Sequence, residues 1–227
     1  MGDVHGRADL LEKLLGLIFS DAAGNMDNSL IFLGDYIDRG PDSRRVVDVL
    51  TQFVATDFNL ITLKGNHEEM LLQFLEGEGP MMTWLRNGGR ETLKSYGVDV
   101  ADLYQTSATD EAMEAARRTL RKAMPGSHVE FLAALELTYQ EGDYLFVHAG
   151  IRPGIPVSEQ KEEDLIWIRK DFINSDADFG KIVVHGHSIS ARPVVSKNKI
   201  GIDTGAWRSD VLSALVLEGV ERRFLST

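Results

Sequence analysis

The sequence predicts an α/β fold with a parallel β-α-β core and a mostly helical insertion. Short apolar runs of strand length alternate with longer stretches whose apolar residues recur at helical spacing. Several of the short runs end in a polar segment that contains aspartate, histidine or asparagine. The stretch from residue 77 to about 134 breaks this alternation and is typical of helices. A length of 227 residues suits one domain, residues 1–227, that carries this insertion.

Helices and strands alternate in the first part of the chain. The leucine stripe of residues 7–19 predicts a helix, and SLIFL at 29–33 predicts a buried strand. The apolar spacing over 46–54 predicts a second helix, NLITL at 59–63 a second strand, and residues 67–75 a third helix. A helix between two strands provides the crossover that parallel strands require, so the two strands should pair in parallel.

The remaining elements divide into helix and strand. Within the insertion, an Ala/Arg-rich segment at 110–124 predicts a helix, and His128 after it is expected to cap a helix or face solvent. The end of the chain returns to apolar runs of strand length: 144–147, 181–184, 194–196, 200–202 and 212–217.

Composition excludes several functions. The formal net charge of −11 disfavours general nucleic-acid binding, which needs a basic surface. The chain has no cysteine, which excludes a thiolate nucleophile and fits a reducing compartment. We see no signal peptide and no apolar run of bilayer-spanning length, so we expect a cytoplasmic protein without a membrane partner. The oligomeric state is left open.

Five polar segments share one chemistry. They are GDVHG at residues 2–6, GDYIDRG at 34–40, GNHEE at 65–69, HAG at 148–150 and HGH at 185–187. The carboxyl ends of neighbouring strands in α/β folds share one crevice, so the segments should converge. Aspartate, histidine and asparagine together suit Mn²⁺, Fe²⁺ or Zn²⁺. In the first segment the Asp and the His are two residues apart, so on extended backbone both side chains reach one ion.

These segments resemble those of the phosphoprotein phosphatase family of calcineurin-like metallophosphoesterases, which includes Ser/Thr protein phosphatases and symmetrical diadenosine tetraphosphatases. WLRNGGRETLKSYG, DLIWIRKDF and IGIDTGAW are similar to stretches of compact bacterial members. The resemblance implies a central β-sandwich of mixed sheets flanked by helices. It also implies an apolar strand before Asp3, and we therefore expect further residues upstream of Met1.

The same resemblance implies a site with two divalent metal ions, Mn²⁺ in the first place and Fe or Zn as alternatives. A water shared by the two ions would lose a proton and attack phosphorus in line. For the last ligand His185 is an alternative, but the motif favours His187. The implied ligands are Asp3, His5 and Asp35 for the first ion, and Asp35, Asn66, His148 and His187 for the second.

The resemblance further assigns catalytic and substrate-binding residues. His67 would protonate the leaving group with Asp38 as its partner, because an adjacent carboxylate raises the pKa of an imidazole. Arg39 and Arg169 would clamp phosphate, since a guanidinium meets two oxygens at once. Three alternatives remain open. Arg39 could pair only with Asp35 or Asp38, and Arg169 could lie on an ordinary amphipathic helix. Residues Asn87–Arg90 could form a structural turn in place of a substrate loop.

The expected activity is hydrolysis of phosphoserine, phosphothreonine and other phosphomonoesters. The expected substrate is therefore a phosphoprotein or a small phosphoester. The alternative is a symmetrical diadenosine tetraphosphatase, which would need stacking surfaces and cations in the insertion; aromatic residues are sparse there, but arginines are present. A remote alternative is an inactive metal-binding module. The sequence argues against it, because every position of the motifs holds the expected residue.

Overall fold

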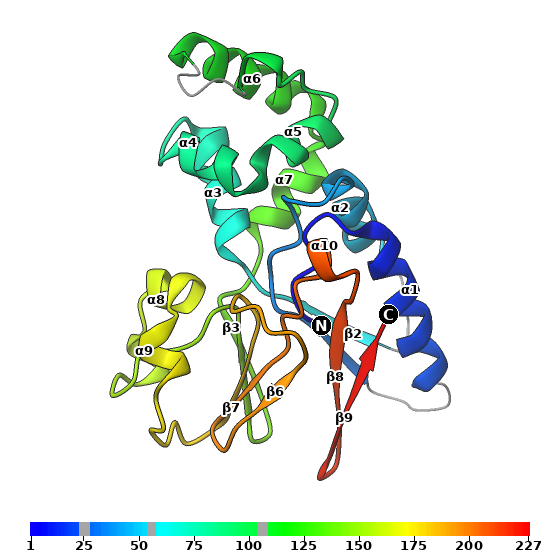
Figure 1. Cartoon of the computed structure of the whole chain (residues 1–227), viewed down its shortest axis with the longest axis vertical. Coiled ribbons are helices and arrows are strands. Elements are labelled where there is room, and N and C mark those ends of the chain that lie inside the picture. Colours follow the sequence, from blue (N-terminus) through cyan, green and yellow to red (C-terminus); the bar gives the residue numbers. More distant parts are fainter. Residues whose placement is uncertain (23–27, 54–57, 104–108) are drawn as a thin grey trace.

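The structure is a computed structural model that describes residues 1–22, 28–53, 58–103 and 109–227. Figure 1 shows a group of helices at one end of the molecule and the sheets at the other, with two short helices beside the sheets. The helices are α1 (Ala8–Asp21), α2 (Ser43–Thr51), α3 (Asn66–Glu76), α4 (Met81–Trp84), α5 (Arg90–Ser95), α6 (Asp110–Ala123), α7 (Gly126–Ala133), α8 (Glu162–Trp167), α9 (Lys170–Ile173) and α10 (Ala206–Ser209). Val54 of the second apolar stripe lies outside the described residues.

The described strands form three sheets. β1 (Asn28–Phe32) pairs in parallel with β2 (Phe58–Thr62), as the β-α-β pattern predicts. The second sheet has the order β3-β4-β5-β7-β6, in which β4 (Tyr144–Val147), β5 (Ile182–His185) and β7 (Lys199–Gly201) are parallel and both edge strands are antiparallel. The remaining strands are β3 (Thr138–Glu141), β6 (Val194–Val195), and the antiparallel pair β8 (Ser213–Glu218) and β9 (Glu221–Ser226).

The mixed sheets and flanking helices confirm the predicted fold class. Buried aliphatic side chains of the first and second sheets pack together in one core cluster. Ile31 and Ile61 come from the first sheet, and Val184 and Ile200 come from the second. The sequence prediction missed β3 and β9. Both are rich in polar residues, so they lack the apolar runs that predict strands.

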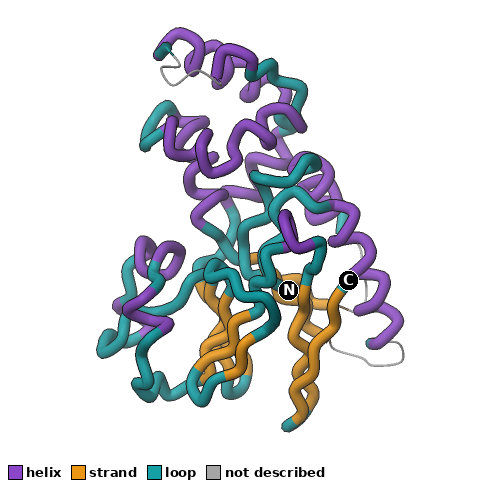
Figure 2. The backbone as a smooth tube through the Cα atoms, viewed as in Figure 1, coloured by secondary structure: helices purple, strands orange, loops and turns teal. Residues whose placement is uncertain are grey.

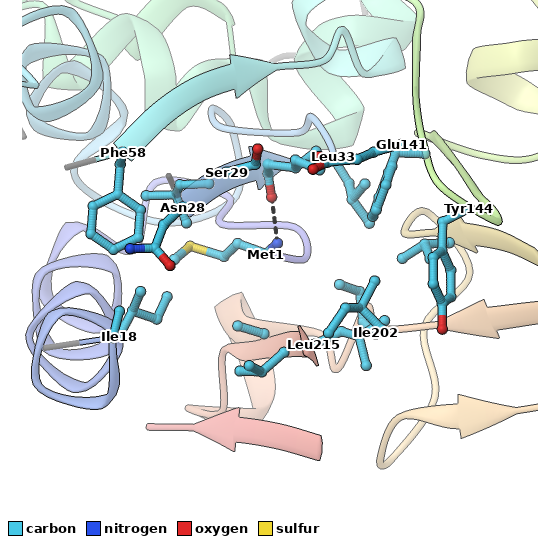
Figure 3. Close-up of a pocket in the computed structure, with 18 of the residues that line it drawn as sticks. Met1, Ile18, Asn28, Ser29, Leu33, Phe58, Glu141, Tyr144, Ile202 and Leu215 are labelled. Carbon is cyan, nitrogen blue, oxygen red and sulfur yellow. Dashed lines mark hydrogen bonds between the residues drawn. The ribbon is translucent and has the colours of Figure 1, made fainter. Parts of the chain in front are cut away.

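Residue Met1 is buried and bonded to its neighbours, although residues 1–3 are not part of an assigned strand. Its amine donates to the carbonyl oxygen of Ile31, and its own carbonyl accepts from the amide of Leu33. Gly2 donates to the carbonyl of Ser213, where β8 begins. The first residues thus connect β1 to β8, beside a mostly apolar cavity of about 430 Å³ that Figure 3 shows.

Helices α4–α7 occupy the segment that was expected to be helical, and α6 matches the predicted helix at 110–124. The expectation for His128 is wrong: its side chain is 2% exposed. It lies between the hydroxyl of Tyr96, at 2.9 Å, and a carboxylate oxygen of Asp48, at 3.0 Å. No helix among the described residues is long and apolar enough to cross a membrane.

Candidate metal centre

The five polar segments converge where strands give way to loops. Figure 2 shows loops and turns gathered between the sheets and the helical end of the molecule. Backbone hydrogen bonds join the first two segments, because the amides of Val4 and His5 donate to the carbonyl of Asp35. The amide of Gly186 donates to the carbonyl of His148, which joins the last two. Backbone hydrogen bonds therefore fix the first polar segment to the second, and the fourth to the fifth.

The backbone at this place is strained. Five residues of the polar segments have a positive φ although none is glycine: His5, Asp35, Asp38, Arg39 and His187. Asp210 is the one other such residue in the described part of the chain. The left-handed region costs a non-glycine residue energy, so it persists only where the surroundings enforce it, and such residues gather at functional sites.

Asp35 lies at the centre of the cluster. Its Oδ2 is 3.4 Å from Nε2 of His5, and its Oδ1 is 3.4 Å from Nε2 of His148. The ligand atoms of Asp35, His5 and His67 lie within 4.8 Å of one another, and so do those of Asp35, His148 and His187. Asp35 is thus the common member of two adjacent groups, as a carboxylate that bridges two ions would be.

The second group includes the asparagine as well. Nε2 of His148 is 3.1 Å from Oδ1 of Asn66 and 3.2 Å from Nδ1 of His187. His185 takes no part in this group. Its ring lies edge-on to Phe172, and its Nδ1 donates to the carbonyl of Gly186. Of the two histidines in HGH, the structure therefore brings His187 to the cluster.

Two buried polar atoms at the cluster lack a hydrogen-bond partner among the described residues: Oδ1 of Asp3 and Nε2 of His187. The other carboxylate oxygen of Asp3 accepts from the amide of His187 at 3.0 Å. A buried polar atom without a partner costs about 1–3 kcal/mol, so such atoms are rare unless a ligand satisfies them. The donor set of carboxylate, imidazole and amide oxygen fits divalent cations.

The ring orientations of two histidines also fit metal binding. Nδ1 of His5 donates to the carbonyl of Ile37, and Nδ1 of His148 donates to that of Leu33, both at 2.8 Å. These bonds turn each Nε2, with its lone pair, toward Asp35. Burial lowers the pKa of both imidazoles, which keeps them neutral, the form that binds metal.

His67 and Asp38 form a buried pair next to Asp35. Nδ1 of His67 lies 2.7 Å from Oδ2 of Asp38, which also accepts from the indole Nε1 of Trp84 at 2.8 Å. The hydroxyl of Thr92 donates to the other oxygen of Asp38. Burial by itself would lower the pKa of His67, but Asp35 and Asp38 raise it above the ordinary value. The pair holds a proton close to the cluster.

The two arginines reach the cluster from different elements. The guanidinium of Arg39 lies between two imidazoles, 3.0 Å from Nε2 of His5 and 3.1 Å from Nε2 of His67. Arg169 donates to the carbonyl of His187 at 3.2 Å. Asn87 and Arg90 are engaged differently: Asn87 donates to the carbonyl of Thr83, and Arg90 donates to those of Leu85 and Leu103. Both bind backbone within the helical segment.

The sequence analysis missed two buried carboxylates. Glu68 accepts from the amides of Asp35, Tyr36 and Gly65 at 2.8–3.0 Å, so it joins the second and third polar segments. Asp203, from the IGIDTGAW stretch, lies beside Asp3, and burial together with this neighbour raises the pKa of Asp3. Glu68 lies within the GNHEE motif and Asp203 within the IGIDTGAW stretch, so these motifs were the available signals for the two residues.

Comparison with known proteins identifies the family. Residues 1–205 match the sequence family of the calcineurin-like phosphoesterases. The chain belongs to the calcineurin-like phosphoesterase family. This confirms the resemblance seen in the sequence and establishes the chain as a metal-dependent phosphatase. Members of this metallophosphoesterase family use divalent metals, and the buried aspartate and histidine side chains around Asp35 are candidate ligands for them.

The chain is similar to several named phosphatases. The chain is 31% identical to serine/threonine-protein phosphatase 2 of Escherichia coli, with 94% of the chain and 89% of the relative covered. It is 26% identical to the asymmetrical bis(5′-nucleosyl)-tetraphosphatase PrpE of Anoxybacillus flavithermus, with coverages of 95% and 88%. Among solved structures, a provisionally assigned diadenosine tetraphosphatase superposes with a TM-score of 0.67 at 21% identity over 99% of this chain and 90% of that one. A cold-active protein-tyrosine phosphatase of a Shewanella species gives 0.59 at 18% identity, with coverages of 99% and 78%.

Proposed function

We propose that the protein is a serine/threonine protein phosphatase with broad phosphomonoesterase activity and a pair of Mn²⁺ ions, with Fe or Zn as alternatives. The observation that carries this is the central position of Asp35 between two groups of ligand atoms. The 31% identity to a bacterial Ser/Thr phosphatase supports the substrate class. The single-domain organisation and a cytoplasmic location stay predictions.

Six side chains would hold the ions: Asp3, His5, Asp35, Asn66, His148 and His187. Oδ1 of Asp3 is buried and lacks a partner among the described residues, so an ion there would remove an energetic cost. When bound, a pair of divalent ions supplies Lewis acidity and makes water a nucleophile at neutral pH.

The remaining residues of the site act on the substrate. Arg39 and Arg169 clamp the phosphate oxygens, and the guanidinium fork suits two oxygens at once. His67 donates the proton that the departing alkoxide needs, and Asp38 orients its ring and stabilises the protonated form. Trp84 and Thr92 in turn fix the carboxylate of Asp38. Asn87 and Arg90 are proposed to contact substrate, and bonds to backbone carbonyls of the helical segment fix both side chains.

A second candidate function is hydrolysis of dinucleoside polyphosphates, because a relative at 26% identity is named a bis(5′-nucleosyl)-tetraphosphatase, although of the asymmetrical kind and not the symmetrical kind expected from the sequence. The chemistry at phosphorus is the same for both, so the metal cluster does not separate them. A side-by-side assay of a phosphoserine peptide, p-nitrophenyl phosphate and diadenosine tetraphosphate, each with Mn²⁺ and with a chelator, tests the proposal. Faster turnover of the tetraphosphate than of the peptide would favour the second candidate. Absence of metal-dependent turnover on all three would overturn both.

A further inference from the structure

An open hollow of about 530 Å³ lies beside the second metal group. Its walls are α8, α9, the segment between them and residues 152–161 before α8; Figure 1 shows the two helices at the side of the five-stranded sheet. The side chains that matter for its chemistry are Arg152, Lys161, Asp164, Trp167, Arg169 and Lys170. Since Arg169 is both a wall of this hollow and a proposed phosphate clamp, the hollow adjoins the place where phosphate binds.

Trp167 presents an aromatic surface in this hollow. Its side chain is 39% exposed, and its ring centroid is 6.1 Å from that of His187, with the two rings nearly perpendicular. Trp167 and Arg169 both line the hollow, and Arg169 also donates to the carbonyl of His187. An indole and a guanidinium thus stand together at the edge of the cluster.

The other exposed indole of the site has a different environment. Trp207 is 37% exposed, but the guanidinium carbon of Arg39 lies 5.5 Å from its ring centroid and that of Arg208 lies 5.9 Å away. Its ring therefore supports the guanidinium that faces His5 and His67. Trp167 instead faces an open space large enough for the part of a substrate that extends beyond the phosphate.

The charges of the hollow favour an anionic ligand next to that ring. Arg152 is paired with Asp164 at 2.5 Å and with Asp171 at 3.2 Å, which neutralises much of that end. Lys161 and Lys170 add positive charge near Arg169, and Glu163 is the one further carboxylate of the lining. A flat ring joined to phosphate would meet both the indole and the cations.

We propose that Trp167 is a specificity-determining residue that stacks on a planar ring in the leaving group of the substrate. The proposal rests on the phosphatase function stated above. The ring is the side chain of an aromatic residue or aryl ester in one case and a nucleobase in the other, and both present the same flat π surface. Stacking of this kind is worth about three- to tenfold in affinity, and it acts equally on bound substrate and transition state.

The test compares benzyl phosphate with cyclohexylmethyl phosphate, which both release a primary alcohol and differ in the flat ring. The wild type should show a KM for the benzyl ester about three- to tenfold below that for the cyclohexylmethyl ester. Trp167→Leu should bring the two KM values together with kcat unchanged, and Trp167→Phe should keep the difference. Phe19→Leu, at a 40% exposed aromatic on α1, is the control and should also keep it.

Equal KM values in the wild type, or a difference that survives Trp167→Leu, would overturn the proposal while leaving the phosphatase function intact. Absence of metal-dependent hydrolysis of both esters would count against the phosphatase function instead. Binding of the matching phosphonates then tests ring preference without turnover: retention of the benzyl preference in Trp167→Leu overturns the role of Trp167, and its loss supports it. The double variant Lys161→Ala, Lys170→Ala identifies the source of the ring. If the ring is a nucleobase, this variant should bind a nucleoside triphosphate more weakly than the wild type does, with binding of benzyl phosphonate unchanged. If the ring is not a nucleobase, the binding of both ligands should be unchanged.

Discussion

Nδ1 of His67 lies 2.7 Å from a carboxylate oxygen of Asp38, and neither side chain is more than 1% exposed. The same Asp38 receives hydrogen bonds from Trp84 and Thr92, so its orientation is fixed by residues of the helical segment. A buried, oriented carboxylate beside an imidazole is the arrangement that keeps a general acid protonated. The chemistry of the site therefore depends on the packing of helices well away from it in sequence.

If His67 is the general acid, His67→Asn should lower kcat about 10²–10⁴-fold on an alkyl phosphate and leave metal content nearly unchanged. The loss should be smaller on p-nitrophenyl phosphate, whose leaving group needs little protonation. Steady-state kinetics on both esters, with metal analysis of the purified variant, measure this. Nε2 of His67 lies 3.9 Å from Oδ2 of Asp35, so the metal analysis is essential. Loss of one ion would show that His67 is a ligand.

Glu68→Gln should weaken metal binding although Glu68 is not a proposed ligand. Its carboxylate accepts from amides of two ligand-bearing segments, and the amide group of glutamine has one acceptor oxygen instead of two. Residues that orient metal ligands typically contribute 10–100-fold to affinity, so we expect a loss of about that size in calorimetric titration with Mn²⁺. Glu69→Gln is the matched control, because Glu69 pairs with Lys64 and Gln73 instead. Equal effects of the two substitutions would contradict the role of Glu68.

Asp3→Asn and Asp35→Asn should differ in the number of ions lost. Asp35 belongs to both groups of ligand atoms, whereas Asp3 is proposed as a ligand of the first ion alone. The Asp3 variant should keep about one ion per chain, and the Asp35 variant should weaken both. Anomalous scattering at the metal edge, together with elemental analysis, distinguishes the two sites. Loss of both ions from the Asp3 variant would remove its assignment to one site.

His128 should make stability depend on pH. Burial, aided by the nearby positive charge of Arg44, lowers its pKa below the ordinary value of 6.5 although Asp48 acts in the opposite direction. In the neutral ring one nitrogen accepts from Tyr96 and the other donates to Asp48, so both are satisfied without a charge. The unfolded chain then binds the proton more readily than the folded chain, so the stabilisation is complete above pH 6.5 and is lost as pH falls below it.

Urea unfolding of the wild type and of His128→Gln, at pH 7.5 and 5.5 with the same metal concentration, measures this effect. The wild type should be the more stable protein at pH 7.5, and its advantage should shrink at pH 5.5. An advantage that grows at low pH would mean that a protonated His128 paired with Asp48 dominates.

The convergence of the proposed ligands was predictable because most of them lie in short motifs that follow a strand, and parallel strands bring those ends together. The supports of the cluster were less predictable. Trp84 and Thr92 contact Asp38 although they are 46 and 54 residues away in the sequence, and nothing in the sequence pattern indicates these contacts. Asp203 reaches Asp3 because β7 lies next to β5, and the order of strands in a sheet does not follow from periodicity. The buried His128 was missed because its partners come from α2 and from the residue that follows α5, and not from its own helix.

The left-handed backbone of His5, Asp35, Asp38, Arg39 and His187 bears on how this enzyme can be engineered. Glycine adopts that conformation without strain, but Asp38→Gly would also leave the buried donors of Trp84 and Thr92 without an acceptor, so the strained backbone and the hydrogen bonds of the site are held together. A selection for heat resistance alone takes no account of the chemistry at these five positions, so it does not protect their activity. Libraries made to raise thermal tolerance should hold them constant and place their variation in the outer faces of α1 and α6.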